Sequence, residues 1–358
     1  MKILFLATDA YGINGGIAKF NRDLIEAISS YVKCSEVIML SIHSSKPAPK
    51  NLKLNYFPAQ RKSKISYVLH SIKQSLTLRK HDVIICGHIH LIPVAYAAHL
   101  LSGAPIFLIV HGLEAWQKTA SIITNILVKK INGYISVSAF TEKRFLAWAG
   151  LIERGYIFPN CVDIDVYTPG PKRVDLMERY HLKCRRVILT VARLASNERF
   201  KGIDEVLDVF SEILKIDDEL TYLICGDGDD KIRFQEKVAR LGLQDHVIFS
   251  GFIDESEKVD HYRLADVFVM PGKAEGFGIV YLEAMACGVP VIGSTLDGSQ
   301  ETLMQGRLGA LVDPSNSREL KSAILEALNK PKLVPREQLK FFSFQSFEKR
   351  CHAFLERI

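Results

Sequence analysis

The chain has 358 residues, of which 48% are hydrophobic and 24% are charged, and its formal net charge is +6. This length exceeds one typical domain and suits two domains of about 170 residues each. The hydrophobic content is sufficient for two full cores, so the composition excludes a mainly disordered chain.

Cysteine usage and hydropathy limit the cellular setting. The cysteines are odd in number and never form a C-x-x-C arrangement, which predicts free thiols in a reducing cytoplasm and argues against disulfides and structural zinc. They are Cys34, Cys86, Cys161, Cys184, Cys225, Cys287 and Cys351. Met1–Ala7 is too short for a signal peptide. Residues 83–113 lack Asp, Glu, Lys and Arg, but Pro93 and Pro105 divide them into pieces too short to span a bilayer.

The first half of the chain alternates apolar, strand-like runs with helical patterns, which is typical of an α/β fold with a parallel sheet. We expect strands near residues 2–7, 36–42, 52–57, 83–87, 105–110 and 134–137. We expect helices near residues 17–30, 64–79, 91–101, 119–131 and 139–148. The polar, proline-bearing stretch 159–171 then resembles an interdomain linker.

The same alternation restarts after the linker and predicts a second doubly wound unit. Its strands are expected near residues 187–191, 221–225, 247–250, 266–270 and 290–293. Its helices are expected near 203–215, 230–241, 256–263 and 279–287, followed by helices near 317–329 and 345–357. We therefore predict domains at 1–165 and 166–340, and a C-terminal helix within 341–358.

Residues 11–18 follow the first strand and contain the glycine pair Gly15 and Gly16. The segment is not a full G-x-G-x-x-G, and no acidic residue closes the second strand, where Ile42 and His43 stand. Both departures weaken a dinucleotide-binding interpretation. A simple turn at the start of a helix is the other interpretation of this glycine pair.

Polar residues also follow the fourth and fifth strands of the first half. His111 ends the fifth strand, and His88 and His90 follow the fourth. Because ligands bind at the carboxyl ends of parallel strands, these histidines are candidate site residues, although most such histidines are structural. Glu114, three residues after His111, is a candidate carboxylate for binding an acceptor substrate.

Residues 37–81 contain nine Lys or Arg and no Asp or Glu, and six of these cations fall within 61–80. Apolar residues in that segment have helical spacing. They are Ile65, Val68, Leu69, Ile72 and Leu76. A basic amphipathic helix suits an anionic membrane surface or a lipid diphosphate. An ordinary core stripe beneath a solvated basic face explains the pattern equally well.

Two cations stand at strand ends in the second half. Arg193 ends the strand at 187–191, and Lys201 precedes the next helix. An arginine fork and a lysine point charge at the ligand-binding edge of a sheet can hold a pyrophosphate. Two ordinary surface cations are the alternative.

The run E-G-F-G-I-V-Y-L-E, from Glu275 to Glu283, is the most informative segment. Glu275 lies in a strand-to-helix loop and Glu283 about two turns along the helix. Between them, Gly276 and Gly278 expose N–H groups at a helix N-terminus, which is suited to a diphosphate. Carboxylates on both sides of a phosphate site suit a nucleotide sugar, whereas the spacing alone would fit two surface glutamates.

This segment, with its continuation A-M-A-C-G-V-P-V-I-G-S, resembles the signature of the group 1 (family 4) glycosyltransferases. The resemblance implies the GT-B fold, in which two Rossmann-like doubly wound domains face a cleft and the last helix crosses back to the first domain. It implies an N-terminal acceptor-binding domain and a C-terminal nucleotide-sugar-binding domain. It also implies transfer with retention of anomeric configuration.

The resemblance further implies roles for individual residues. Glu275 would bind hydroxyls of the donor sugar and Glu283 the ribose, while Arg193 and Lys201 would hold the pyrophosphate. His111 would sit beside the reacting centre. The remaining donor-binding positions are Gly15, Gly16, Gly251, Phe252, Ile253, Gly276, Phe277, Gly278 and Ile279. The loop 251–253 would contact the nucleobase, with Asp254 and Lys258 as possible side-chain readers.

Metal-independent chemistry without a cofactor is expected, because neither D-x-D of the chain reads as a metal-binding motif after a strand. Asp163 and Asp165 lie in the linker, and the G-D-G-D-D turn at 226–230 resembles a crevice-shaping loop of the family. The leaving phosphate oxygen would take the proton of the acceptor hydroxyl in a same-face attack.

The sequence thus predicts a hexosyltransferase that uses a UDP- or GDP-sugar in cell-surface polysaccharide synthesis. Its acceptor would be a membrane-associated glycan or a polyprenyl-linked molecule, and the protein would be cytoplasmic or peripheral on the membrane, with no nucleic-acid partner. A nucleotide-sugar 2-epimerase of the same architecture is the main alternative. An NAD-dependent oxidoreductase and a non-catalytic binding module are weaker ones.

Overall fold

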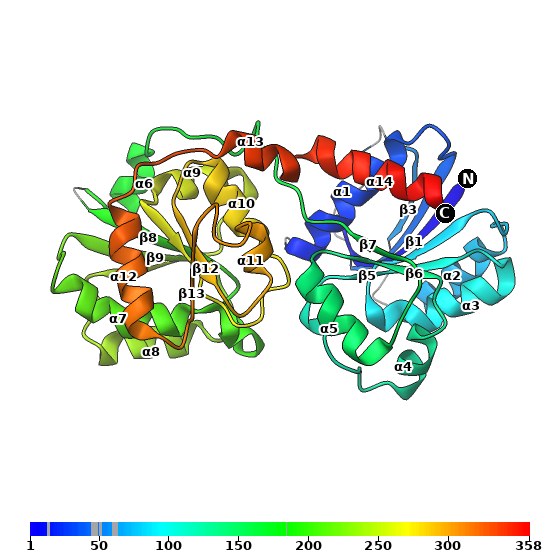
Figure 1. The fold of residues 1–358 in the computed structure, drawn as a ribbon, viewed down its shortest axis with the longest axis horizontal. Helices are drawn as coiled ribbons and strands as arrows, with labels where there is room; N and C mark the ends of the chain where they lie inside the picture. The colour runs from blue at the N-terminus through cyan, green and yellow to red at the C-terminus, as the bar shows by residue number, and fades with distance from the viewer. Residues whose placement is uncertain (13–14, 44–48, 50–51, 59–63, 184) are drawn as a thin grey trace. The chain divides into compact units, whose positions relative to one another are not determined.

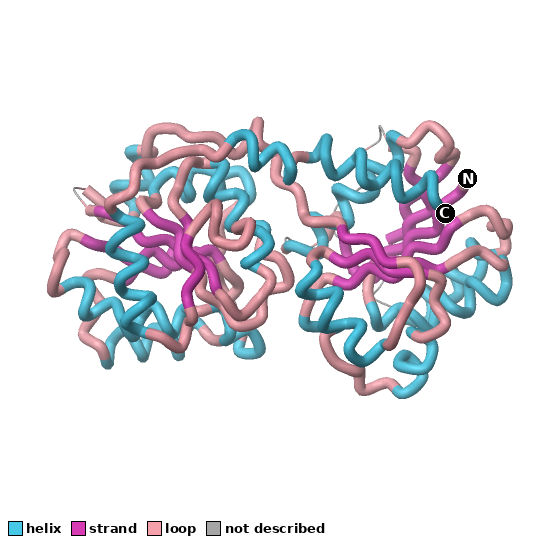
Figure 2. The backbone as a smooth tube through the Cα atoms, in the orientation of Figure 1, coloured by secondary structure: helices cyan, strands magenta, loops and turns pink. Residues whose placement is uncertain are grey.

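The computed structural model describes residues 1–12, 15–43, 49, 52–58, 64–183 and 185–358. It divides into two compact units, each a parallel sheet flanked by helices (Figures 1 and 2). The first unit comprises Met1–Cys161 and Phe344–Ile358, and the second comprises Val162–Ser343. The boundaries expected from the sequence differ from these limits by a few residues, and the functional roles of the two domains stay predictions.

The first unit has a parallel sheet with the strand order β3-β2-β1-β4-β5-β6-β7. Its strands are β1 (Lys2–Asp9), β2 (Glu36–His43), β3 (Leu54–Pro58), β4 (Val83–Cys86), β5 (Ile106–Val110), β6 (Gly133–Ser136) and β7 (Gly155–Ile157). Its helices are α1 (Gly16–Ser30), α2 (Lys64–Ser75), α3 (Ile92–Ser102), α4 (Ile122–Val128), α5 (Ala139–Ala149) and α14 (Phe344–Arg357), with 3-10 turns η2 (Ile89–Leu91) and η3 (Leu113–Ala115). β7 was not expected, because three residues at a sheet edge carry no apolar run.

Helices cover both faces of this sheet (Figure 1). One face packs in a single core with side chains from α2, α3, α4 and α5. α1 and α14 pack together on the other face, where Phe107 of β5 meets Phe354 of α14 at a ring distance of 5.1 Å. The predicted return of the last helix to the first domain is therefore confirmed. Burial on both faces explains why β1, β4 and β5 read as continuous apolar runs.

The second unit has the strand order β10-β9-β8-β11-β12-β13, again all parallel. Its strands are β8 (Arg186–Val191), β9 (Leu220–Cys225), β10 (Val247–Gly251), β11 (Val267–Val269), β12 (Val291–Ser294) and β13 (Ala310–Val312). Its main helices are α7 (Ile203–Leu214), α8 (Lys231–Arg240), α9 (Glu255–Leu264), α10 (Ile279–Ala286) and α12 (Ser317–Leu328). Short pieces not expected from the sequence are α6 (Val174–Arg179), η4 (Ser196–Lys201), α11 (Ser299–Thr302), α13 (Arg336–Leu339) and η5 (Lys340–Phe342).

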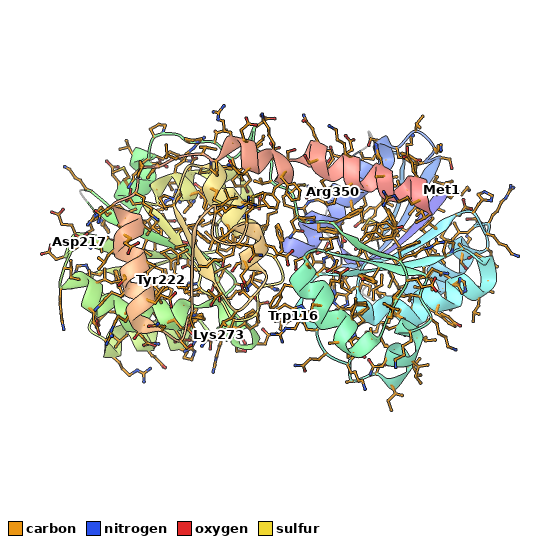
Figure 3. All side chains as sticks on the ribbon, viewed as in Figure 1. Met1, Trp116, Asp217, Tyr222, Lys273 and Arg350 are labelled. Carbon is orange, nitrogen blue, oxygen red and sulfur yellow. The ribbon has the colours of Figure 1, made fainter. Side chains whose placement is uncertain are left out.

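Side chains fill the layers between sheet and helices in both units (Figure 3). In the second unit the labelled Tyr222 is fully buried, and its hydroxyl lies 2.8 Å from the hydroxyl of Thr190 on β8. The six cysteines that the structure describes are free and buried, as small core residues are. Cys184 lies outside the described residues.

The strand order places the candidate residues at one edge of each sheet. In both sheets the order reverses beside the first strand, between β1 and β4 and between β8 and β11. Open α/β sheets bind ligands outside the carboxyl ends of the strands at such a reversal. In the second unit β8 leads to Arg193 and β11 leads to Glu275, and in the first unit β4 leads to His88 and β5 to His111.

Candidate functional site

An ion pair at the reversal of the second sheet joins two of the predicted residues. The Lys201 Nζ atom lies 2.6 Å from Glu275 Oε2, and the two side chains are 19% and 18% exposed. Burial acts to lower the pKa of Lys201, but the Glu275 carboxylate outweighs it and the pKa is raised overall. Lys201 therefore keeps its charge, and the partial exposure of the pair leaves it open to a polar ligand.

Arg193 belongs to the same group of charges. Its exposed guanidinium forms an ion pair with Glu198 of η4. Glu198 and Arg193 also act on the pKa of Lys201, the first raising it and the second lowering it. Because exposed ion pairs contribute little stability, an incoming diphosphate can take Arg193 from Glu198 at small cost.

Asp297 holds the loop that carries Glu275. The Glu275 N–H donates to Asp297 Oδ2 at 3.0 Å, and the Gly298 N–H donates to the Glu275 carbonyl at 2.8 Å. Asp297 is fully buried, and its Oδ1 accepts from the N–H and the hydroxyl of Ser299. Burial raises the pKa of this carboxyl to about 7. Sequence reasoning missed Asp297, although an acid three residues after an apolar strand, at the ligand-binding edge of a sheet, is a usable signal.

Gly278 at the start of α10 and Gly298 at the start of α11 have steric reasons to be there. Gly278 has φ +85°, and a Cβ at this position would lie 2.5 Å from the Tyr281 ring. A Cβ on Gly298 would lie 2.2 Å from the Gly276 carbonyl oxygen, so these two loops touch through their backbones. Phe277 is buried against Phe342, so its side chain belongs to the core. Ile279 is likewise buried at the first position of the helix.

Both oxygens of the Glu283 carboxylate are bonded to neighbouring side chains. Its side chain is fully buried, with Oε1 2.8 Å from Lys258 Nζ and Oε2 accepting from the Tyr262 hydroxyl at 2.6 Å. Lys258, considered as a base reader, is thus paired with the predicted ribose ligand. Binding a ribose at Glu283 would require Lys258 to move.

The loop predicted to contact the nucleobase follows β10. Gly251 has φ +73° and its carbonyl accepts from the Gly226 N–H at 2.9 Å. Phe252 is exposed and Ile253 half-buried. Asp254 caps α9 by accepting from the Ser256 N–H, so its carboxylate serves the helix.

The G-D-G-D-D turn supports the segment around Arg193. A Cβ on Gly226 would lie 1.8 Å from the Ala192 carbonyl oxygen, and the Leu194 N–H donates to the Asp227 carbonyl at 3.0 Å. Asp230 is buried and pairs with Arg199 at 2.7 Å. In the part of the chain that the structure describes, His, Cys, Asp and Glu side chains form no group that could hold a metal ion. Metal independence stays a prediction.

In the first unit, the His111 ring is neutral, and a hydrogen bond to the backbone fixes its orientation. Its Nε2 atom lies 3.1 Å from the Gly87 carbonyl oxygen, and burial lowers the pKa of the ring to about 4. With the proton on Nε2 donated to Gly87, Nδ1 is left as an acceptor. The geometry therefore favours accepting a hydrogen bond from a ligand hydroxyl over donating one.

The polar side chains of Glu114 and His88 accept hydrogen bonds from backbone groups of their own loops. Glu114 Oε1 accepts from the N–H groups of His111 and Gly112, at 2.7 and 3.1 Å, so this candidate acceptor-binding carboxylate orients the loop. His88 Nδ1 accepts from the His90 N–H, and burial lowers the pKa of His88 to about 4.

Gly15 and Gly16 precede and begin α1. A Cβ at either position would meet nothing within 4 Å, so packing does not demand glycine there. Their predicted approach to the donor stays a prediction, and residues 13–14 of the same loop lie outside the described residues.

Two family models match successive parts of this chain. Residues 14–166 match "Glycosyltransferase Family 4" and residues 178–340 match "Glycosyl transferases group 1". The chain therefore belongs to the group 1 (family 4) glycosyltransferases, and the resemblance seen in the sequence is confirmed.

Curated relatives and solved structures agree with this assignment. The chain is 33% identical over 204 residues to a GDP-mannose-dependent phosphatidylinositol monomannoside mannosyltransferase of Mycolicibacterium smegmatis, covering 55% of this chain and 53% of the relative. It is 32% identical over 173 residues to the alpha-monoglucosyldiacylglycerol synthase of Streptococcus pneumoniae, covering 47% of this chain and 38% of the relative. The chain thus spans about half or less of the length of these relatives.

The fold is that of the Anabaena protein HepE, solved with UDP and glucose. The two structures have a TM-score of 0.83 at 20% identity, and all of both chains is covered. The predicted GT-B fold with two Rossmann-like sheets is therefore confirmed.

Proposed function

We propose that this protein is a retaining hexosyltransferase that uses a UDP- or GDP-sugar. Its acceptor would be a membrane-associated glycan or a lipid-linked molecule in cell-surface polysaccharide synthesis. The Lys201–Glu275 pair at the reversal of the second sheet carries the proposal, because it offers a cation for a diphosphate beside a carboxylate for sugar hydroxyls. The two relatives named above, a GDP-mannose-dependent phosphatidylinositol monomannoside mannosyltransferase and a monoglucosyldiacylglycerol synthase, support the donor and acceptor classes.

In the proposed reaction, Arg193, Lys201 and the N–H groups at the start of α10 bind the diphosphate. Glu275 orients the sugar through its hydroxyls, and Glu283 takes the ribose once Lys258 releases it. The bond between the anomeric carbon and the phosphate oxygen breaks as the acceptor oxygen attacks from the same face. The leaving phosphate takes the acceptor proton, and the two cations stabilise its charge without a metal.

The first unit would contribute His111, whose free Nδ1 can accept a hydrogen bond from a donor-sugar hydroxyl. Gly15 and Gly16 would allow their backbone to approach the donor. The nucleobase would meet the loop at 251–253, where Phe252 is exposed.

Nucleotide binding tests the proposal directly. Saturation-transfer NMR with UDP, GDP and NAD, in buffer containing a chelator, should show one nucleoside diphosphate bound by the wild type and lost in Arg193→Ala. Glu212→Ala is the matched control, since Glu212 pairs with Lys321 on the surface of the same unit. Binding of NAD alone, or of no nucleotide, would contradict the proposal. Donor breakdown with sugar rearrangement in the absence of any acceptor would indicate an isomerase.

We also propose that residues 61–80 bind an anionic membrane surface. Residues 61–63 lie outside the described residues, but α2 begins at Lys64. Its buried side chains are Tyr67, Ser71 and Ser75, whereas Ile65, Leu69 and Leu76 are 73%, 61% and 66% exposed. The apolar stripe is thus not an ordinary core stripe, and its exposure beside basic residues supports membrane binding.

No helix in the described ranges has both the length and the apolar character needed to cross a bilayer. Neutralising Arg61, Lys62 and Lys64 should weaken sedimentation with anionic vesicles, because it removes positive charge from this segment. Unchanged sedimentation would remove the α2 proposal.

A further inference from the structure

α3 is a surface helix without charge. Its eleven residues, Ile92–Ser102, include no Asp, Glu, Lys or Arg. Leu100 and Leu101 are exposed, and Tyr96 and Ala97 are half-buried. A helix at the surface of a globular unit normally carries polar residues on its outer side, so an uncharged outer side indicates an apolar environment or partner.

α4 shows the same feature on a shorter element. Ile122, Ile123 and Ile126 are 74%, 63% and 53% exposed, and Lys129 and Lys130 follow the helix directly. Three exposed isoleucines in seven residues are unfavourable in water.

The three helices are neighbours. α2 packs beside α3, and α3 packs beside α4, on the same face of the sheet (Figure 1). The Lys130 Nζ atom lies 5.8 Å from the centre of the Tyr96 ring, which joins the end of α4 to the middle of α3. We call the exposed apolar side chains of these helices, with Lys64 at the start of α2 and Lys129 and Lys130 after α4, the three-helix surface. Its apolar members are Ile65, Leu69, Leu76, Leu100, Leu101, Ile122, Ile123 and Ile126.

Charge identifies what would cover this surface. Residues 37–141 contain twelve Lys or Arg and only two acids, Asp82 and Glu114. Both acids are occupied by backbone groups: Asp82 accepts from the N–H groups of Lys2 and Arg79, and Glu114 from those of His111 and Gly112. Apolar side chains within such a basic region complement a bilayer with anionic headgroups.

We propose that the three-helix surface as a whole docks on an anionic lipid bilayer, with the α4 isoleucines and the α3 leucines entering the headgroup boundary alongside α2. The inference rests on the proposed membrane partner and extends it from one helix to three. Docking through three helices would fix the orientation of the first unit on the membrane, which a single helix does not.

Vesicle binding of the full chain tests the inference, with phosphatidylcholine vesicles with and without phosphatidylglycerol. Ile122→Ser/Ile123→Ser/Ile126→Ser and Ile65→Ser/Leu69→Ser/Leu76→Ser should each lower the affinity for anionic vesicles by about tenfold or more. Ile216→Ser/Ile232→Ser, which alters exposed isoleucines of the second unit, is the control and should bind like the wild type.

Wild-type binding by the α4 variant, with binding lost in the α2 variant, would overturn the three-helix surface and leave the α2 proposal intact. Equal binding of both vesicle types would overturn the choice of an anionic bilayer, as would capture by an acidic protein without vesicle binding. None of these results tests the donor site, because the nucleotide-binding experiment tests that site separately.

A second measurement covers the case in which the triple variant fails to fold. Ile123→Trp should show a blue-shifted emission with anionic vesicles and quenching by brominated lipid, relative to the wild type with Trp116 and Trp148. Emission unchanged by vesicles would overturn the inference.

Discussion

The two units have equivalent strand orders, but they place different kinds of polar residue at the point where the order reverses. In the second unit the polar residues are ion pairs: Lys201 with Glu275 and Arg193 with Glu198. In the first unit they bond to the backbone, with the His111 ring donating to a carbonyl and the Glu114 carboxylate accepting from N–H groups. Paired charges can be exchanged for the charges of a diphosphate, whereas a neutral ring suits sugar hydroxyls. In the proposed function, the same architecture would thus serve two kinds of recognition, set by a few loop residues.

The largest expected effect lies in the second unit. Glu275→Gln keeps the size of the side chain but removes its charge from Lys201, so we expect transfer to fall about 100- to 1000-fold. Steady-state kinetics with UDP- and GDP-sugars would measure this loss, and Glu212→Gln serves as the control. Near-normal turnover in Glu275→Gln would show that the ion pair is structural.

Asp297 should make the second unit sensitive to pH. Its folded-state pKa, about 7, lies above the ordinary value of 3.8, so the folded form holds the proton where the unfolded form has lost it. Its stabilising contribution is present below pH 3.8 and is lost as the pH rises to about 7, by a few kcal/mol at most. Denaturant unfolding of the wild type and of Asp297→Asn across this range should differ in slope. Parallel curves would remove Asp297 as the cause.

Substitution by alanine should change the free energy of unfolding by different amounts at two glycines that are predicted to bind the donor. Gly278→Ala forces a side chain into a left-handed backbone against Tyr281, and should lower the free energy of unfolding by about 1–3 kcal/mol. Gly15→Ala meets open space and extended backbone, so its effect on unfolding should stay within about 0.5 kcal/mol. If Gly15→Ala nevertheless weakens donor binding, its role is in the ligand site.

The titration of His111 should affect stability with the opposite sign to that of Asp297. Its folded-state pKa is lowered from 6.5 to about 4, so its contribution to stability is present above pH 6.5 and is lost as the pH falls to about 4. NMR of the imidazole C–H signals, assigned with His111→Asn, should show a ring that stays neutral as the pH falls through 6.5 and titrates only near pH 4. Titration near pH 6.5 would mean that the ring is solvated.

The sequence by itself determined the family and most of the fold. Long apolar runs predict buried parallel strands, and the order of elements predicts two doubly wound units. The short elements β7 and β13 escaped prediction, because three residues carry no measurable period. The segment from Glu275 to Glu283 was sufficient to predict the family, because it combines glycines, carboxylates and the signals of a helix start.

Only the tertiary structure decided how the site residues are engaged. Lys201 and Glu275 are 74 positions apart, and no local pattern states that they meet. The same holds for Asp297 beneath the Glu275 loop and for Lys258 on Glu283. Helical spacing showed that the apolar residues of α2 share one face, but spacing does not say which face is buried. That choice depends on the neighbouring helices and the sheet, and they leave the apolar face exposed.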